Sequence, residues 1–65
     1  MREEWTGEVI KAMHLNEIGQ ADIAEEMGVT KSYVSMLLNG ARKVEGAREK
    51  IEAALQRALE KKYIA

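Results

Sequence analysis

The stretch that decides the fold is residues 20–40, with the sequence QADIAEEMGVTKSYVSMLLNG. Its first part predicts a short helix over residues 20–27, because Ile23, Ala24 and Met27 recur at the spacing of one helical face. Gly28 follows the last apolar residue, and a glycine there suits the left-handed backbone conformation that ends many helices. This part therefore predicts one short helix that stops at a glycine turn.

A second short helix is predicted directly after the turn. Thr30 is a good N-cap residue, because its hydroxyl oxygen can accept a hydrogen bond from a backbone N–H of the first turn. The helix is expected over residues 31–38, and its inward face consists of Val34, Leu37 and Leu38. The pair Asn39-Gly40 then favours a helix stop.

Two short helices joined by a tight turn form the helix-turn-helix pattern, in which the second helix enters the major groove of DNA. The pattern requires a small residue where the helices cross, which is Ala24, and a glycine in the turn, which is Gly28. It also requires apolar residues on the inner face of the second helix, and Val34 and Leu37 meet this condition. The alternative is an ordinary helical hairpin within a bundle.

A helix and a loop are predicted before this stretch. The helix extends from about Glu3 to His14 and has an apolar stripe of Trp5, Val9, Ala12 and Met13, widened by Ile10. In the loop that follows, we expect the apolar side chains of Leu15 and Ile18 to fill the space beneath the loop. Gly19 has no side chain with which to cap the next helix, so a weakly capped start is expected there.

A basic loop and a longer helix are predicted after it. The loop covers residues 41–45 and has one apolar anchor, Val44. The helix is expected from about Gly46 to Lys62. Its apolar residues are the stacked Ile51, Leu55 and Leu59 and the flanking Ala47, Ala54 and Ala58. Strand-like alternation does not occur, so the predicted fold class is all-α.

The segments Gln20–Ala24, Gly28–Thr30 and Val34–Gly40 together resemble the phage repressor and Cro-like (XRE-type) helix-turn-helix family. The resemblance covers roughly residues 5–60. The chain is most similar to the compact members of the family, which prophages and mobile elements often encode. It implies a small four- or five-helix, lambda-repressor-like domain over residues 1–65, with the motif at about 20–40. The implied function is that of a transcriptional regulator, expected to be a repressor, which binds a palindromic operator, usually as a dimer.

The resemblance also implies which residues contact double-stranded DNA. Base edges would be contacted by Lys31, Ser32, Ser35 and Met36. Phosphates would be contacted by Gln20, Thr30, Tyr33, Asn39, Gly40, Arg42 and Lys43, with the Asn39-Gly40 exit offering backbone amides. The chemistry agrees, because lysine donates to guanine O6 and N7, whereas phosphate contacts position the protein without specifying sequence. Tyr33 would offer its hydroxyl to a phosphate or pack on a thymine methyl group.

Charge is unevenly distributed along the chain. The formal net charge is −1 at pH 7, but residues 1–28 carry −5, residues 29–50 carry +3 and residues 51–65 carry +1. A nucleic-acid ligand requires a basic face rather than a basic average, and the middle segment supplies basic residues. A basic window of this length also arises by chance, so charge alone does not decide the function.

The composition excludes several kinds of site. The chain has 65 residues, enough for one domain, and with no cysteine and one histidine it has no disulfide, thiolate-metal or histidine-rich metal site. Asp22, Glu25 and Glu26 have the spacing of a solvated helical face, without a nucleophile–base pair, so we expect no catalytic site, no cofactor and no small-molecule ligand. Without a long apolar run or a secretory signal, a cytoplasmic location without a membrane partner is expected.

Two interpretations of the partners remain open. A core this small is marginal, and a second subunit is the expected source of extra stability. The predicted homodimer contact is the end of the last helix near Leu59, Tyr63 and Ile64; the other interpretation of that helix is core packed on the first helix. The alternative function is a protein-interaction module, such as an antitoxin or adaptor domain, whose acidic first helix docks a basic partner. Trp5 is expected in the core rather than as a base-stacking platform.

Overall fold

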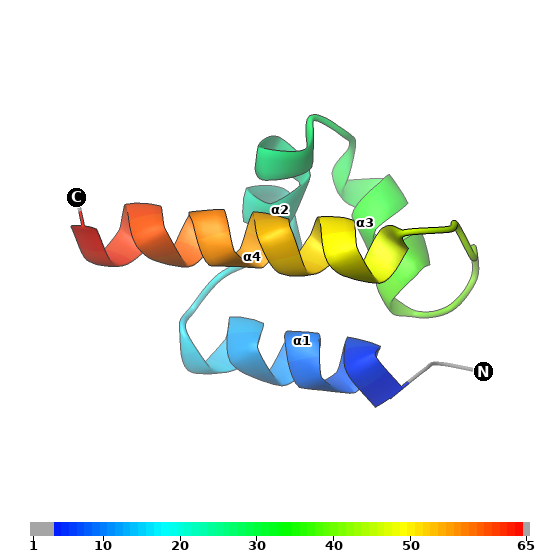
Figure 1. Ribbon diagram of the computed structural model, residues 1–65, viewed down its shortest axis with the longest axis horizontal. Coiled ribbons are helices and arrows are strands. Elements are labelled where there is room, and N and C mark those ends of the chain that lie inside the picture. Colours follow the sequence, from blue (N-terminus) through cyan, green and yellow to red (C-terminus); the bar gives the residue numbers. More distant parts are fainter. Residues whose placement is uncertain (1–3, 65) are drawn as a thin grey trace.

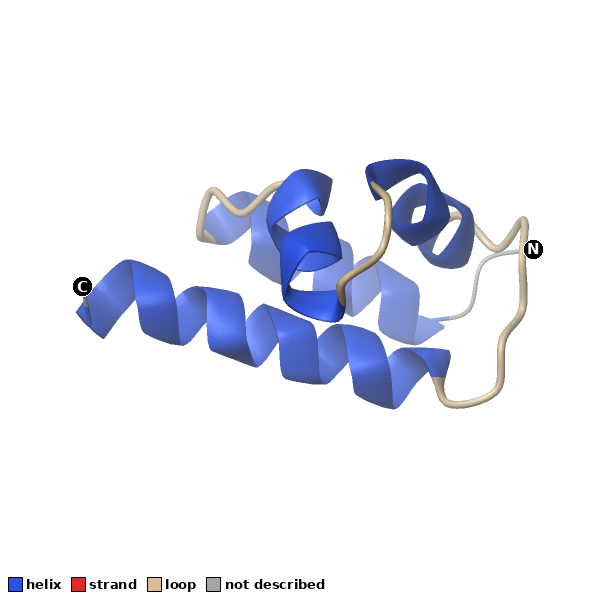
Figure 2. Ribbon diagram, turned by 90° about the horizontal axis from the view of Figure 1, so that it is seen from above, coloured by secondary structure: helices blue, strands red, loops and turns tan. Residues whose placement is uncertain are grey.

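The computed structural model describes residues 4–64, which form four helices without a strand. They are α1 (Glu4–Leu15), α2 (Gln20–Met27), α3 (Lys31–Leu38) and α4 (Ala47–Ile64). α4 follows the long axis of the molecule and α1 lies beside it in the same direction, so both helices end at the same end of the protein (Figure 1). The shorter α2 packs against α4 and against α3 (Figure 2). The predicted all-α class is confirmed for the described residues.

The predicted bounds of the two central helices are confirmed, and those of the outer helices differ by one or two residues. Residues 20–27 and 31–38 are helical as expected. α1 continues one residue past His14, and α4 begins one residue after Gly46 and continues to Ile64. Glu3, the expected start of the first helix, lies outside the described residues. Within residues 4–64, no helix combines the length and the apolar character that a membrane crossing requires.

The core lies where the helices meet, and it contains the apolar stripes predicted for all four. Ile23, Val34 and Ile51 are fully buried. The other buried apolar residues are Val9, Met13, Ile18, Ala24, Leu37, Leu38, Ala47, Ala54, Leu55 and Ala58. Trp5, Ile10, Ala12, Met27, Val44 and Leu59 are partly buried and pack against them. Burial of one Val, Leu or Ile side chain contributes roughly 1.5–3 kcal/mol, so these stripes hold the short helices together.

The turn between α2 and α3 has the predicted geometry. Gly28 has φ 71°, and its N–H and that of Val29 donate to the Glu25 and Ala24 carbonyls. This pair of bonds around a left-handed residue satisfies carbonyls that the helix end leaves free. Thr30 then begins α3, and its Oγ1 accepts a hydrogen bond from the Tyr33 N–H at 3.1 Å. The expectations for Gly28 and Thr30 are confirmed.

The prediction that Leu15 plugs the first loop is wrong. Leu15 is the last residue of α1, and its side chain is 73% exposed. The helix ends instead through Glu17, which has φ 55°, and through an Ile18 N–H bond to the Met13 carbonyl at 2.8 Å. In this type of helix end, the residue after the left-handed one packs on the preceding helix. Ile18 therefore fills the space below the turn, and Leu15 is left outside.

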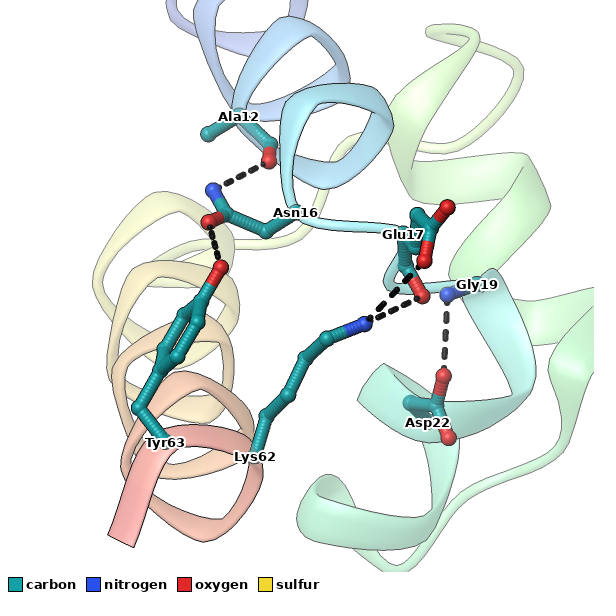
Figure 3. Close-up of polar contacts among 7 residues, drawn as sticks. All are labelled: Ala12, Asn16, Glu17, Gly19, Asp22, Lys62 and Tyr63. Carbon is teal, nitrogen blue, oxygen red and sulfur yellow. Dashed lines mark hydrogen bonds and ion pairs between the residues drawn. The ribbon is translucent and has the colours of Figure 1, made fainter.

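The start of α2 has a cap that the sequence analysis did not predict. Gly19 has extended backbone angles and contributes no side chain. Its N–H donates to the Asp22 Oδ2 at 2.9 Å (Figure 3). An acidic side chain at this third helical position satisfies a backbone donor and also suits the positive end of the helix dipole. Asp22 therefore caps its own helix rather than belonging to a purely solvated face.

Glu26 is a second departure from the predicted solvated face. Its side chain is 10% exposed, because α4 lies against this side of α2. Arg57 Nε lies 3.4 Å from the Glu26 Oε1, Arg57 Nη2 donates to the Glu26 carbonyl at 3.1 Å, and Lys61 Nζ pairs with Oε2. This Glu26 clamp, made of Glu26, Arg57 and Lys61, joins the end of α2 to α4.

The last turn of α4 is tied to the turn between α1 and α2 (Figure 3). The Tyr63 hydroxyl donates to the Asn16 Oδ1 at 2.7 Å, and the Asn16 side-chain amide donates to the Ala12 carbonyl at 2.8 Å. Lys62 Nζ donates to the Glu17 carbonyl at 3.4 Å and lies 3.8 Å from its carboxylate. These contacts, the terminal clasp, hold the ends of α1 and α4 in a defined relation.

Candidate nucleic-acid interface

The four residues predicted to contact bases lie on the outer side of α3. Val34, Leu37 and Leu38 bury the opposite side of this helix. Lys31, Ser32 and Met36 are exposed and Ser35 is half-buried. Positions i, i+1, i+4 and i+5 share one broad helical face, so the fold brings together the four side chains Lys31, Ser32, Ser35 and Met36. An eight-residue helix is about 12 Å long, a length that fits within the major groove.

Thr30 occupies the beginning of this surface. Because its Oγ1 accepts the Tyr33 N–H, the oxygen is used in capping α3. A hydroxyl is also a donor and its hydrogen can rotate, so the Thr30 O–H can still donate to an anion placed at the helix start. The capping role and the predicted phosphate contact are therefore compatible.

Gln20 lies beside Lys31, although eleven positions separate them in the sequence. Both residues line a surface groove between the end of α1 and the starts of α2 and α3. The groove floor includes Ile10, Met13 and Ile18. His14 also lines it, and sequence analysis treated this residue only as a helix-end side chain. Its position at the predicted junction of the first helix and the loop was the available indication that it borders the same surface.

The segment after α3 folds back on that helix. The Arg42 N–H donates to the Met36 carbonyl at 3.2 Å, and the Ala41 N–H donates to the Asn39 Oδ1 at 3.3 Å. The Arg42 guanidinium carbon lies 5.4 Å from the centre of the Tyr33 ring. Gly40 has φ 78°, which permits the reversal. The main chain at Arg42 is thus bonded to the second turn of α3, and its side chain lies against Tyr33 rather than extending away from the helix.

The backbone amide of Asn39 is not available in the way that sequence analysis expected. Its N–H donates to the Ser35 carbonyl at 3.0 Å. The Asn39 side-chain oxygen is occupied by the Ala41 N–H. A phosphate contact from Asn39 would therefore come from its side-chain NH2 group.

Three cations at the two ends of α3 are free of carboxylates. Lys31, Arg42 and Lys43 are exposed. Among residues 4–64, none of the three has a carboxylate oxygen within ion-pair distance. Such a surface cation can exchange its hydration for contact with an anionic ligand without first breaking an ion pair. Lys31 lies at the start of α3, and Arg42 and Lys43 follow its end.

The Glu26 clamp connects α2 to α4, and it also shifts the pKa values of two of its groups. The hydrogen bond from the Lys61 ammonium lowers the pKa of Glu26, partial burial of the carboxyl opposes this effect, and the nearby Arg57 guanidinium lowers it further. The same hydrogen bond, reinforced by the negative charge of Glu26, raises the pKa of Lys61. Both groups are therefore held more firmly in their charged forms than in the unfolded chain.

Comparisons of the chain with models of known protein families, with curated proteins and with solved structures find no match. A function is therefore inferred from the residues and geometry described above. These comprise an exposed polar face on α3, free cations at both of its ends and a shared groove beside Gln20.

Proposed function

We propose that this chain is a sequence-specific DNA-binding regulator of the phage repressor type, with a lambda-repressor-like helix-turn-helix fold. The observation that carries the proposal is the surface of α3, where four exposed or half-buried predicted base contacts are flanked by three cations that form no ion pair within residues 4–64. α3 would lie in the major groove of operator DNA. Occupation of the operator would block access to a promoter.

The proposed contacts divide into those that specify sequence and those that position the protein. Lys31 would donate to guanine O6 and N7, and Met36 would contact a thymine methyl group. Ser32 and Ser35 would add weaker base contacts. Arg42 and Lys43 would bind phosphates beyond the end of α3, and Gln20 and Thr30 would bind phosphates at its start.

We propose in addition that the protein forms a two-fold dimer through a terminal patch of Leu15, Tyr63 and Ile64. These side chains are 73%, 66% and 79% exposed and lie on helices that end at the same end of the molecule (Figure 1). Leu59, which sequence analysis included in the contact, packs against the protein's own core. Leu15 takes its place in the proposed patch. A two-fold dimer would match a palindromic operator.

Sedimentation tests the dimer. The wild type is expected to be dimeric when free or when bound to its duplex, and a Leu15→Ser/Ile64→Ser variant is expected to be monomeric. Val29→Ser is the control, because Val29 is an exposed apolar residue away from the terminal patch. A wild-type monomer both free and on DNA would exclude the dimer.

Selection of bound duplexes from a random pool tests DNA recognition itself. The wild type is expected to enrich an inverted repeat. Lys31→Ala is expected to relax the preference at one or two positions of each half-site, since one lysine contacts one or two bases. If the wild type enriches no sequence, recognition of a specific operator is excluded.

A protein-interaction module is the second candidate, and the terminal patch favours it because an exposed apolar group on a small domain commonly binds another protein. Lys31→Glu with Arg42→Glu separates the two functions. The double substitution is expected to abolish DNA binding and to leave any binding through the terminal patch or the acidic side of α1 intact. Binding of a protein partner that the double substitution leaves intact, together with no DNA affinity in the wild type, would favour the second candidate.

A further inference from the structure

Tyr33 and Arg42 form a contact that links α3 to the segment that follows it. The guanidinium lies 5.4 Å from the centre of the ring, within the range in which a cation is attracted to an aromatic face. Nine positions separate the two residues. The contact arises because the main chain reverses at Gly40 and the Arg42 N–H bonds to the Met36 carbonyl.

The ring is a fixed surface rather than a mobile side chain. Tyr33 is partly buried and packs against the core. Its backbone N–H is held by the Thr30 side chain. Arg42, in contrast, is exposed and has no carboxylate partner among residues 4–64. The main-chain bond and the ring together restrict where its guanidinium can lie.

We infer that Tyr33 is a positioning residue, whose ring holds the Arg42 guanidinium beside α3 in readiness for a DNA phosphate. This inference rests on the proposed DNA-binding function and assigns to the Tyr33 ring a role that the sequence analysis gave to its hydroxyl. A free arginine side chain loses much rotamer freedom when it binds a phosphate. An arginine that is already held in place loses less for each hydrogen bond that it forms.

The test compares ring and hydroxyl through matched substitutions, with affinity measured for a labelled duplex of the selected sequence at several salt concentrations. Tyr33→Phe keeps the ring and is expected to bind like the wild type. Tyr33→Leu keeps an apolar, smaller side chain but removes the aromatic face, and is expected to weaken binding about three-fold. Thermal melting confirms that both variants are folded.

Arg42→Gln supplies the second arm. It is expected to make the fall of log affinity with log salt concentration less steep by about 0.9, the value for one phosphate contact. Tyr33→Leu is expected to leave this slope unchanged, because the charge remains. In the Arg42→Gln background, Tyr33→Leu is expected to have no further effect, since the ring acts only through the arginine.

Several outcomes would overturn the inference. Equal weakening by Tyr33→Phe and Tyr33→Leu would assign the contact to the hydroxyl. Weakening by Tyr33→Leu that persists without Arg42 would indicate a general effect on the fold of α3. Tighter binding by Tyr33→Leu would mean that the ring withholds the arginine from DNA.

A measurement without DNA separates this inference from the proposed function. In the nuclear magnetic resonance spectrum of the free protein, the ring current of Tyr33 is expected to shift the Arg42 side-chain protons, and Tyr33→Leu is expected to remove the shift. If the wild type binds DNA and depends on Arg42, but this ring-current shift is missing, the positioning role fails and the DNA-binding function stands. If the shift is present and the wild type binds no duplex, both the function and the positioning role toward DNA fail.

Discussion

Two groups of cations in this protein differ in what they contact. Arg57, Lys61 and Lys62, near the end of α4, all pair with carboxylates of the α1–α2 region. Lys31, Arg42 and Lys43, at the two ends of α3, pair with no carboxylate within residues 4–64. The first group joins elements that are distant in the sequence. The second group faces solvent.

The difference is relevant to how a chain with net charge −1 could bind DNA through the α3 surface, as we propose. Glu17 and Glu26 belong to the acidic first 28 residues, and both are partnered by α4. Their negative charge is therefore compensated on the α4 side, away from the groups at the ends of α3. The charge that matters for a ligand is that of the α3 surface, which the net charge of the whole chain does not describe.

The largest predicted effect comes from removing each group of three cations in turn. Lys31→Gln/Arg42→Gln/Lys43→Gln is expected to weaken binding to a labelled duplex about 100-fold at low salt, because three phosphate or base contacts are lost. Its thermal midpoint is expected to change little, since these side chains form no ion pair with the described part of the chain.

The matched control is Arg57→Gln/Lys61→Gln/Lys62→Gln, which removes the same net charge. It is expected to lower the thermal midpoint and, at temperatures where it is folded, to keep most of the DNA affinity. Equal losses of affinity in the two triple variants would show that only the net charge matters and would break the distinction between the two groups.

A smaller effect is expected at Gly28, in the turn that joins α2 to α3. Gly28→Ala places a side chain at φ 71°, and is expected to lower the free energy of unfolding by about 1 kcal/mol. Gly7→Ala is the matched substitution, because Gly7 lies in α1 with open space around it. It is expected to raise the free energy of unfolding by roughly 0.5–1 kcal/mol, since alanine is the better helix former. Urea denaturation measures the free energy of unfolding of both variants. A Gly28→Ala variant more stable than the wild type would contradict the expected backbone strain at this position.

The Glu26 clamp predicts a dependence of stability on pH. The pKa of Glu26 is lower in the folded protein than its ordinary value of 4.5. Its contribution is therefore fully present above that value and is lost as the pH falls through the lower folded pKa. Glu26→Gln is expected to be less stable than wild type at neutral pH and to lose this difference in acid.

Lys61 extends this prediction to alkaline pH. Its pKa is raised above 10.5 in the folded protein, so its contribution is present below 10.5 and is lost as the pH rises through the higher folded value. Thermal midpoints of wild type and Glu26→Gln across the pH range measure both limbs. Parallel curves for the two proteins would show that the clamp does not contribute.

The smallest predicted effect concerns the terminal clasp. Tyr63→Phe removes the hydroxyl that donates to Asn16, and is expected to lower the free energy of unfolding by about 0.5–1 kcal/mol. Tyr33→Phe is the matched control, because the Tyr33 hydroxyl has no hydrogen-bond partner among residues 4–64, and a change within about 0.5 kcal/mol is expected for it. Identical results for the two substitutions would mean that the clasp adds no stability.

The sequence determined the local features of the fold. The bounds of α2 and α3, the left-handed Gly28 and the Thr30 cap were all predicted. The buried faces were predicted as well, including Val34 and Ile51. Each of these features depends on residues within one or two turns of one another, so helical periodicity and capping chemistry suffice to predict them. The candidate base contacts on α3 were implied by the family resemblance, and helical periodicity adds only that they share one face.

Only the tertiary structure decided the contacts between distant residues. Glu26 and Arg57 are 31 positions apart, and Asn16 and Tyr63 are 47 positions apart. Leu15 is exposed because the left-handed Glu17 directs Ile18 into the core, and a left-handed glutamate has no clear sequence pattern. Spacing along one helix says which side chains share a face. Which partner covers that face depends on how the helices pack, and packing is set by the whole core at once.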